Sequence, residues 1–201
     1  MRVLVACEFS GIVREAFRAL GCDAWSCDVL PSEHPYKGPH LEGDVRNWLE
    51  PDCTPPGKPW DLMIAHPPCR YLNHAGVRWI YKDGKRWLKD KEGKVIGENP
   101  RDEERWRNMR EAAQFFLSLL NAPIPHIAVE NSEMHPHALE LVGVPPTQSI
   151  HPWQHGHGES KETCLWLKGL PPLAPTNLVS GRTPRVHHAS PGPDPALGAG
   201  A

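Results

Sequence analysis

The sequence predicts an α/β fold in which helices flank an open, mostly parallel sheet. Short apolar runs at residues 2–7, 61–65 and 126–129 are typical of strands that are buried on both faces. Longer segments at 12–20 and 102–120 instead place apolar residues at helical spacing. Strands that alternate with helices favour a parallel sheet, because each helix returns the chain to the end where the previous strand began.

The first 28 residues form a strand, turn, helix and strand unit. After the opening strand, the turn 8–11 leads into the helix 12–20, and Gly21 is suited to end that helix. A second strand at 24–27 ends in Asp28.

The helix 102–120 is the clearest element of the remaining chain. Trp106, Met109, Ala113 and Phe116 recur three or four residues apart, and acidic residues occupy the first turn. The other expected elements, in chain order, are rigid loops at 30–43 and 51–59 and strands at 61–65, 126–129 and 164–167.

Length and composition indicate one domain. The chain has 201 residues, of which 39% are hydrophobic and 23% charged. We place the domain at residues 1–175, with a basic hairpin inserted at 77–98, and expect 176–201 to be a disordered or truncated tail.

No apolar run approaches the roughly 18 residues that span a membrane. We therefore expect a cytoplasmic protein without membrane contact.

The charge and the cysteines narrow the possible functions. A net charge of −2 gives no global attraction to nucleic acid, so such binding requires a local basic patch. The six cysteines form no CxxC pair, and apart from Cys69 we interpret them as small core residues. The histidine-rich stretch 151–157 lacks a partner cluster at ligand spacing, so we predict no metal site.

Five residues are expected to meet at one edge of the sheet. Gly11, Asp28, Asp44, Cys69 and Glu130 follow the ends of successive strands or lie in the loops beyond them. Ligands of open parallel sheets bind beyond this carboxyl edge. Alternatively, each of the five only caps a helix or ends a turn.

The segment His66-Pro67-Pro68-Cys69 indicates that a thiol is held in a defined position. Two consecutive prolines fix the backbone and remove two donors, so the strand cannot continue. A thiolate is a strong nucleophile, and Glu130 on a neighbouring strand could supply the proton that attack on a conjugated ring requires. The alternative is a structural thiol behind a Pro-Pro turn.

The first turn and two acids suit a nucleoside-bearing cofactor. The turn 8–11 before a helix resembles a loop whose backbone N–H groups face a ligand, although it lacks the full GxGxxG pattern. Asp28 is placed like the acid that binds a ribose diol, and Asp44 lies further along the same edge.

Together these motifs resemble those of a known family. The specific part is Pro-Pro-Cys followed by Glu-Asn; the remaining motifs are common to cofactor-binding sheets. In chain order, Phe9-Ser10-Gly11, Asp28, Gly43-Asp44, Pro67-Pro68-Cys69 and Glu130-Asn131 resemble the ordered motifs of the DNA cytosine-5 methyltransferases, most closely short phage-type members that lack a separate target-recognition domain. The resemblance covers roughly residues 2–170.

The resemblance implies a Rossmann-like fold of the S-adenosylmethionine-dependent methyltransferase type, in a bacterial or phage-infected cell. It implies that Asp28 holds the ribose of S-adenosylmethionine and that Asp44 accepts from the adenine amine. The other cofactor-binding residues that it implies are Phe9, Ser10, Gly11, Val29 and Pro67.

The resemblance also implies the catalytic roles. Cys69 would add to C6 of cytosine, which makes C5 the nucleophile that takes the methyl group. Glu130 would hold and protonate the ring at N3, and Asn131 would brace the Pro-Pro-Cys loop. Family members carry a Gln-x-Arg-x-Arg segment where this chain has Glu159-Ser160-Lys161-Glu162-Thr163, so Lys161 and Thr163 are the candidates to replace its arginines.

The segment 77–98 is the candidate nucleic-acid contact. Two Gly-containing stretches, Lys82–Lys85 and Lys91–Lys94, are typical of hairpin tips, and aromatic residues alternate with cations. The residues that we assign to nucleic-acid binding are Arg70, Arg78, Trp79, Lys82, Lys85, Arg86 and Lys89. The partner would be duplex DNA with a flipped cytosine, or a single strand. The hairpin could equally be a dimer contact, so the oligomeric state stays open.

Two other functions remain open. The same fold and cysteine could modify the pyrimidine of another substrate, such as RNA or a free nucleotide, or could transfer a modified methyl group. The chain could instead be a catalytically silent protein that binds nucleic acid or cofactor. An amino-methyltransferase is disfavoured, because Cys69 occupies the position at which that chemistry uses an aromatic residue.

Overall fold

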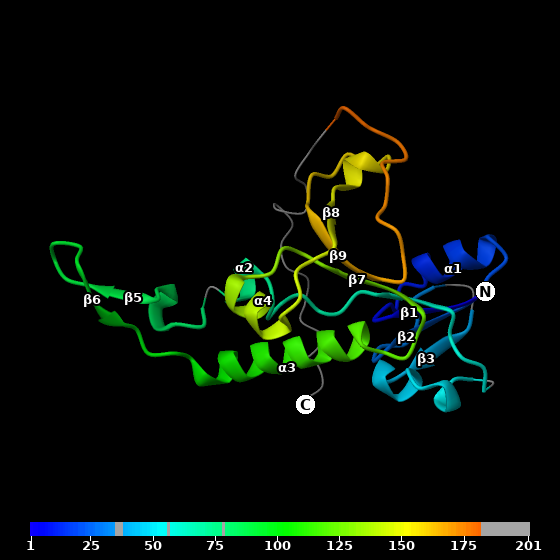
Figure 1. The fold of residues 1–201 in the computed structure, drawn as a ribbon, viewed down its shortest axis with the longest axis horizontal. Coiled ribbons are helices and arrows are strands. Elements are labelled where there is room, and N and C mark those ends of the chain that lie inside the picture. Colours follow the sequence, from blue (N-terminus) through cyan, green and yellow to red (C-terminus); the bar gives the residue numbers. More distant parts are fainter. Residues whose placement is uncertain (35–37, 56, 78, 182–201) are drawn as a thin grey trace.

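The computed structural model describes residues 1–34, 38–55, 57–77 and 79–181. Within these ranges the chain forms a seven-stranded sheet and a separate two-stranded ribbon (Figure 1). The sheet contains β1 (Arg2–Ala6), β2 (Asp23–Asp28), β3 (His40–Glu42), β4 (Leu62–Ala65), β7 (His126–Asn131), β8 (Gln148–Ile150) and β9 (Thr163–Lys168). The ribbon consists of β5 (Trp87–Lys89) and β6 (Val95–Glu98).

The sheet has the strand order β3-β2-β1-β4-β7-β9-β8. The five adjacent strands β3, β2, β1, β4 and β7 run parallel to one another. The strand β9 runs antiparallel to its two neighbours, β7 and β8. The order changes direction between β1 and β4, which is the switch point where open α/β sheets bind ligands. This arrangement confirms the predicted α/β fold class, an open and mostly parallel Rossmann-like sheet.

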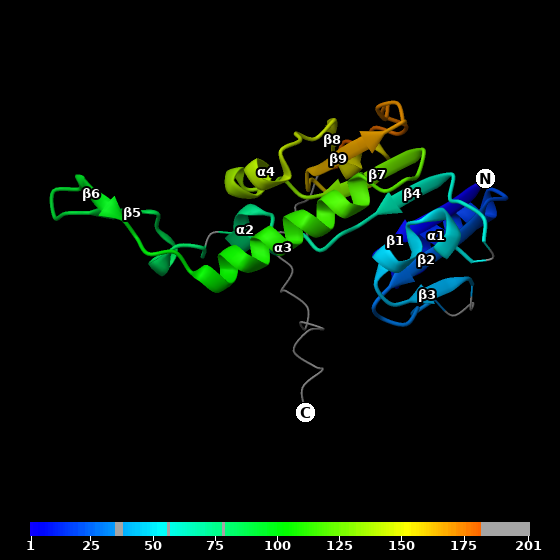
Figure 2. The same ribbon diagram turned by 60° about the horizontal axis from the view of Figure 1, so that its bottom comes forward.

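Helices cover both faces of the sheet (Figures 1 and 2). The long helix α3 packs its buried residues, among them Met109 and Phe116, on one face, and α1 packs Val13 and Phe17 on the other. Strand residues alternate between these two layers, so neighbours in sequence face opposite sides. The helices are α1 (Ile12–Ala19), α2 (His74–Val77), α3 (Glu103–Leu120) and α4 (Pro136–Val142), with 3-10 turns η1 (Val45–Trp48), η2 (Pro51–Cys53), η3 (Lys82–Gly84) and η4 (Pro152–Gln154).

The predicted strands and long helices agree with the structure to within two residues at each end. The short elements β3, β8 and α2 escaped prediction because three or four residues show no periodicity. The helix α4 was also missed, although Pro136 at its start and Gly143, in the left-handed conformation at its end, are common helix boundary signals.

The predicted hairpin at 77–98 was wrong in part. Val77 belongs to α2 and is buried, and Lys82–Gly84 forms the 3-10 turn η3 instead of a hairpin tip. The second predicted tip is correct, since the ribbon turns between Asp90 and Lys94. Arg78 lies outside the described residues.

The cysteines differ in burial more than we expected. Cys27 and Cys164 are buried as predicted, Cys7 and Cys22 are half-buried, and Cys53 is exposed. Cys53 ends the 3-10 turn η2 at the surface, so the core prediction was wrong there. In the described part of the chain, none of the helices is both long and apolar enough to cross a membrane.

Candidate functional site

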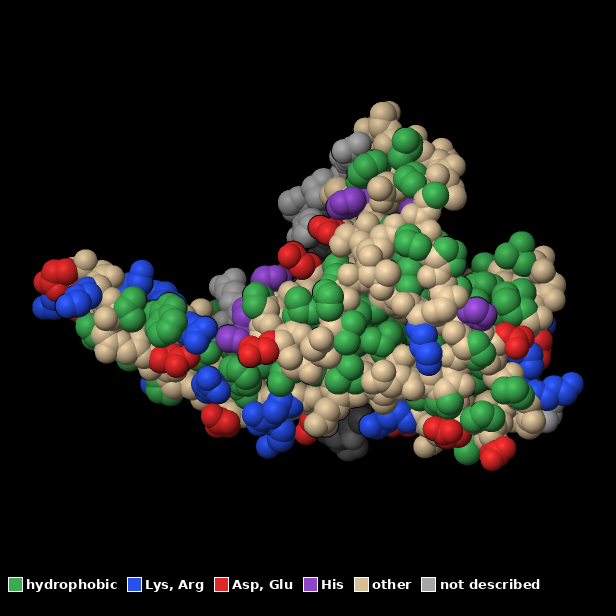
Figure 3. Space-filling view, in the orientation of Figure 1, with side chains coloured by type: hydrophobic (Ala, Val, Ile, Leu, Met, Phe, Trp, Pro, Cys, Tyr) green, Lys and Arg blue, Asp and Glu red, His purple; other side chains and the backbone are tan. Residues whose placement is uncertain are grey.

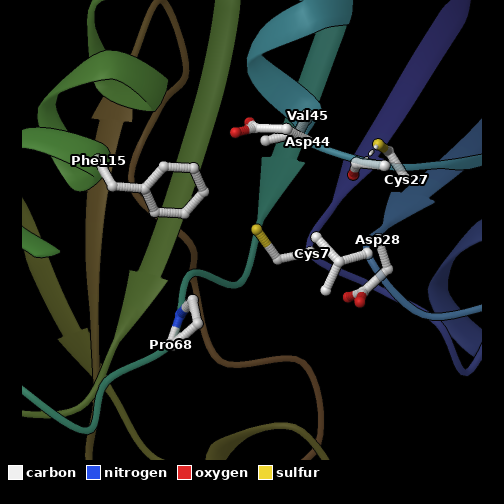
Figure 4. Close-up of a pocket in the computed structure, with 9 residues that line it drawn as sticks. Cys7, Cys27, Asp28, Asp44, Val45, Pro68 and Phe115 are labelled. Carbon is white, nitrogen blue, oxygen red and sulfur yellow. Dashed lines mark hydrogen bonds between the residues drawn. The ribbon is translucent and has the colours of Figure 1, made fainter. Parts of the chain in front are cut away.

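A cavity of about 160 Å³ opens at the carboxyl edge of the sheet, beside the switch point (Figure 4). In Figure 4 the ring of Phe115, from α3, and the thiol of Cys7 face the same space. The cavity is lined by Cys7, Cys27, Asp28, Val29, Gly43, Asp44, Val45, Pro68 and Phe115. The structure thus brings together three predicted cofactor residues, Asp28, Val29 and Asp44. The predicted Pro67 is replaced in the lining by its neighbour Pro68.

Two cysteines line the cavity but are poor nucleophiles. Burial raises the pKa of Cys7 to about 12, and the nearby Asp28 carboxylate acts in the same direction. Burial likewise raises the pKa of Cys27 to about 12, and its thiol donates to the carbonyl oxygen of Gly43 at 3.6 Å. Both thiols therefore stay protonated near neutral pH and contribute polarizable walls.

Asp28 is fixed by its own turn. One carboxylate oxygen accepts a hydrogen bond from the backbone N–H of Leu30 at 3.0 Å, and its carbonyl oxygen accepts from Gly43 N–H at 2.8 Å. These bonds connect the end of β2 to the loop that follows β3. The carboxylate is consequently held against the cavity together with the exposed side chain of Val29, whose exposed fraction is 71%.

Asp44 already has a cationic partner. Its carboxylate accepts from the backbone N–H of Arg46 at 2.9 Å and from the Arg46 guanidinium at 3.0 Å. This hydrogen bonding with Arg46 lowers the pKa of Asp44. Asp44 is therefore an ionised acceptor at the cavity rim, and the exposed Arg46 side chain is the group that a ligand would displace.

The first turn differs from the expected ligand-facing loop. The carboxylate of the buried Glu8 accepts the N–H groups of Val13 at 2.6 Å and Arg14 at 3.2 Å. A carboxylate at a helix N-terminus is electrostatically favourable, so the protein supplies this anion itself. The helix donors are thus not directed at a ligand, and the expectation that they would be was wrong.

Two of the three predicted residues of this turn line a hollow beside the cavity. Phe9 and Ser10 line a second hollow that Cys7 shares, and Ser10 donates to Glu8 at 3.2 Å. Gly11 has φ +72°, and an added Cβ would lie 2.6 Å from the guanidinium of Arg14. A side chain at position 11 would therefore be strained as well as crowded.

The Pro-Pro-Cys loop is held at both ends. His66 N–H donates to the carbonyl oxygen of Ala6, and the carbonyl oxygen of Cys69 accepts from Leu72 and Asn73. The Asn73 amide also donates to the Cys69 sulfur at 3.4 Å. The sulfur of Cys69, which is half-buried, therefore has a hydrogen-bond donor on its own loop.

Glu130 lies beside this loop. The strands β4 and β7 pair in parallel, with Ala65 opposite Val129, so His66 and Glu130 follow as neighbours beyond the paired ends. The Nδ1 of His66 lies 3.5 Å from a carboxylate oxygen of Glu130. The two segments meet again where His135 N–H donates to Leu72 O at 2.8 Å. Cys69 therefore lies in a loop that is attached on both sides to the segment carrying Glu130.

Thr163 shares a face of the sheet with Glu130. The strand β9 is antiparallel to β7, with Glu130 opposite Leu165, and Thr163 is two residues before Leu165. Lys161 lies in the adjoining loop, where its N–H donates to the buried Glu159 carboxylate at 3.3 Å. The sheet register therefore brings Thr163 and the loop of Lys161 to the same edge as Glu130.

Asn131 does not brace the loop as expected. Its side chain is 1% exposed and faces the opposite side of β7 from Glu130. Among the described residues, neither its amide nitrogen nor its oxygen has a hydrogen-bond partner. The expected hydrogen bond to the Pro-Pro-Cys loop is therefore not formed, because strand alternation turns Asn131 into the layer under α3.

Apart from Arg78, which lies outside the described residues, the predicted nucleic-acid residues belong to the segment that runs from the Pro-Pro-Cys loop to the first strand of the ribbon. Arg70 stacks over Tyr71 at 5.5 Å, and Arg86 over Trp87 at 4.6 Å. Trp79, Lys82, Lys85 and Lys89 are exposed. In the ranges that the structure covers, His, Cys, Asp and Glu side chains form no group of three or more that could hold a metal ion.

Sequence reasoning missed several residues of this edge. The positive φ of Cys7, +59°, and the inward position of Phe115 depend on tertiary structure and leave no local signal. His66 and Asn73, which flank the predicted Cys69, could have been found from their position. Glu8 could have been found as an acid that directly precedes a helix.

Comparisons with known proteins add one structural likeness. No protein-family model and no curated protein matches the chain, whereas 68 chains of solved structures do. One of them is a crystal structure provisionally described as a DNA modification methyltransferase encoded within an E. coli prophage. It is 14% identical, with a TM-score of 0.44, and the match covers 83% of this chain and 46% of that one. The chain thus spans about half the length of that protein, and a likeness of this degree assigns no activity.

Proposed function

We propose that the protein is an S-adenosylmethionine-dependent DNA cytosine-5 methyltransferase. One observation carries the proposal: the Cys69 loop and the Glu130 strand are joined at the carboxyl edge, next to a cavity lined by Asp28 and Asp44. Cys69, Glu130 and the two aspartates follow or end different strands near the switch point, and this supports the roles of nucleophile, acid and cofactor ligands that we assign to them.

The lining of the cavity supports the adenosine part of the cofactor as its ligand. Its walls combine apolar surfaces, Val29 and Phe115, with the carboxylates of Asp28 and Asp44. Aromatic and aliphatic walls suit the faces of a purine, and the carboxylates suit hydroxyl and amino donors. Asp28 would hold the ribose hydroxyls and Asp44 the adenine amine. When bound, the cofactor supplies an electrophilic methyl group.

The chain's own residues would carry the remaining steps. The Cys69 thiolate adds to C6 of cytosine while Glu130 donates a proton to N3, so the electrons of the C5–C6 double bond become available at C5. C5 then takes the methyl group. As it does so, the C4–N3 double bond forms again and N3 returns its proton to Glu130. A base then removes the C5 proton, the C5–C6 double bond forms again, and the sulfur leaves C6 as thiolate.

Neighbouring groups would support both catalytic residues. Asn73 donates to the Cys69 sulfur, and His66 lies against the Glu130 carboxylate and would hold its orientation. Lys161 and Thr163, at the same edge, would donate to the ring oxygen O2 in place of the family's arginines.

The test is direct detection of the product. The protein is incubated with S-adenosylmethionine carrying a deuterated methyl group and with unmethylated DNA, and the digested nucleosides are analysed by mass spectrometry. We expect deuterated 5-methylcytosine from the wild type and from Cys53→Ser, a matched change at an exposed cysteine. Cys69→Ser should form none.

Two other outcomes would each assign a different function to the protein. Product on RNA or on free cytidine nucleotides, with none on DNA, would identify a pyrimidine-modifying enzyme with another substrate. Binding of cofactor and DNA without product on any of these substrates would identify a silent binding protein.

A further inference from the structure

The ribbon β5–β6 projects from the body as an arm (Figures 1 and 2). Its large apolar side chains are exposed: Trp87 by 47%, Leu88 by 41%, Val95 by 49% and Ile96 by 65%. A two-stranded ribbon with no covering layer has too little buried surface to be stable by itself. Its conformation must therefore come from its root, its tip and whatever covers it.

The root of the ribbon is fixed in the main core. Ile80 and Tyr81 are buried, and Asp102 N–H donates to Ile80 O at 2.8 Å. The Asn99 amide donates to Lys85 O at 2.7 Å, so the two strands are joined before they leave the body. The arm is consequently positioned as an extension of the domain, and its exposed end starts about two residues beyond these bonds.

The tip is braced by Asp90. Its carboxylate accepts from Glu92 N–H at 3.1 Å and from Lys94 N–H at 2.8 Å, and Gly93 supplies the positive φ of the turn. The Asp90 carboxylate is thus occupied by hydrogen bonds within the tip. Lys89, Lys91 and Lys94 surround it, and none of the three is ion-paired to an acid within the described ranges.

The arm is basic, although the chain is not. Between residues 82 and 98 there are six Lys and Arg residues and four Asp and Glu residues, a net charge of +2, whereas the whole chain carries −2. Figure 3 shows cationic and hydrophobic side chains interspersed along the arm. A second copy of the chain would bring the same positive charge against it, whereas phosphates complement it.

The dimensions of the ribbon select one nucleic-acid groove. Two strands about 4.8 Å apart, with side chains on both sides, form an element roughly 10 Å wide. The major groove of B-DNA is about 12 Å wide and 8.5 Å deep and admits such a ribbon, whereas the minor groove is only about 6 Å wide. From Arg86 to the tip, about five residues at roughly 3.3 Å each give a reach of about 15 Å, which exceeds the depth of the major groove.

We propose that the β5–β6 ribbon enters the major groove of duplex DNA and supplies this chain's contacts to base edges. Lys89, Lys91 and Lys94 bind the phosphates on either side of the groove. Leu88 and Ile96 contact thymine methyl groups, the apolar feature of the groove floor. This inference rests on the proposed function, because it names the duplex as the form of DNA that the methyltransferase recognises.

Duplex affinity tests the phosphate contacts. The dissociation constant for a 30-base-pair duplex is measured by fluorescence anisotropy from 50 to 250 mM salt. For the triple variant Lys89→Gln/Lys91→Gln/Lys94→Gln we expect affinity to fall at least about tenfold and the salt slope to fall by about 3. The charge-matched control, Lys58→Gln/Arg107→Gln/Arg110→Gln on the body, should retain most of the duplex affinity and most of its salt dependence. Equal effects of the two triple variants would overturn the proposal.

Modification of a random-sequence duplex pool tests base reading. Sequencing of the modified sites should show a sequence preference for the wild type that weakens when uracil replaces thymine. Leu88→Ser/Ile96→Ser should lose the preference and become insensitive to uracil. An unchanged preference would overturn the proposal, as would a switch from dimer to monomer, measured by sedimentation, with the preference intact.

Single-stranded DNA separates this inference from the proposed function. Relative to the wild type, ribbon variants should lose far more of the covalent Cys69 adduct on a 5-fluorocytosine duplex than on the matching single-stranded oligonucleotide. If the wild type forms that adduct but the ribbon variants act on duplex as the wild type does, the ribbon proposal fails alone. If the wild type forms no adduct on either form of DNA, the proposed function fails.

Discussion

The sheet edge and the ribbon hold their candidate functional residues in opposite ways. At the edge, Asp28, Cys69 and Glu130 each contact a neighbouring group of the same chain, namely Leu30, Asn73 and His66. On the ribbon, the large side chains from Trp87 to Ile96 are exposed, and the hydrogen bonds that position it lie at its root and tip and between its two strands. Preorganised groups suit chemistry, and an exposed, rigidly rooted arm suits a partner that covers it.

Loss of the acid at the edge should have the largest effect. For Glu130→Gln we expect kcat to fall about 10²- to 10⁴-fold, because the amide is isosteric but cannot supply the proton to N3. Single-turnover kinetics with cofactor binding measured in parallel would test this. Glu133→Gln, on an exposed side chain three residues further on, is the control. A reduction below threefold for Glu130→Gln would show that this carboxyl does not take part in the chemistry.

A change in the cavity at the sheet edge should weaken the binding of S-adenosylmethionine. For Asp28→Asn we expect the dissociation constant of S-adenosylmethionine to rise about 10- to 100-fold, which corresponds to one lost charge-assisted hydrogen bond. Isothermal titration calorimetry measures it. Glu42→Gln changes an exposed carboxylate at the same edge of the sheet, at the end of β3, and should leave the affinity unchanged. Equal affinities for wild type and Asp28→Asn would place the ribose elsewhere.

Asn73 should tune Cys69 without being essential. In Asn73→Asp the side chain can still accept from Gly76 N–H, so the turn before α2 keeps its cap. It replaces the donor to the Cys69 sulfur by a carboxylate, and we expect alkylation of Cys69 at pH 7.5 to slow about tenfold. Iodoacetamide labelling followed by peptide mass spectrometry reports each cysteine separately. Labelling of the exposed Cys53 serves as the internal reference. An unchanged ratio of the Cys69 labelling rate to the Cys53 labelling rate would show that Asn73 does not affect the reactivity of Cys69.

The smallest expected effect lies where the ribbon root meets the body. His137 contacts Tyr81 at 3.4 Å, and His135 packs against His137 and His74. Burial, with a smaller contribution from His137 and His74, lowers the pKa of His135 to about 4. An unfolded histidine has a pKa of about 6.5, so between these values the unfolded chain binds more protons and stability rises with pH.

Acidification should therefore destabilise the protein through this cluster. We expect the free energy of unfolding to fall by about 1–2 kcal/mol from pH 7 to pH 4.5, a value discounted for solvent screening. This fall in the free energy of unfolding should be smaller in His135→Gln than in the wild type. It should be unchanged in His157→Gln, which alters an exposed loop histidine. Urea unfolding at several pH values measures it. The same pH dependence in all three proteins would exclude His135 as its source.

The sequence was informative where function depends on strand ends. Asp28, Cys69 and Glu130 lie at or beyond the ends of strands that the sequence predicts, so a parallel sheet places them on one edge before any contact is known. Cys7 and Phe115 could not be predicted as cavity residues, because one depends on a positive φ and the other on the packing of α3. Asn131 shows a further limit, since its motif suggests a hydrogen bond that the alternation of β7 directs away from the loop.

The most direct test of the account is covalent trapping at Cys69. The protein is incubated with S-adenosylmethionine and with 5-fluorocytosine DNA, single-stranded and duplex, and the products are separated on a denaturing gel. Because fluorine cannot leave as a cation, the enzyme should stay attached to C6. The account predicts an adduct that peptide mass spectrometry maps to Cys69 and that Cys69→Ser lacks. Intact cofactor and DNA binding without an adduct, or an adduct at another cysteine, would contradict it.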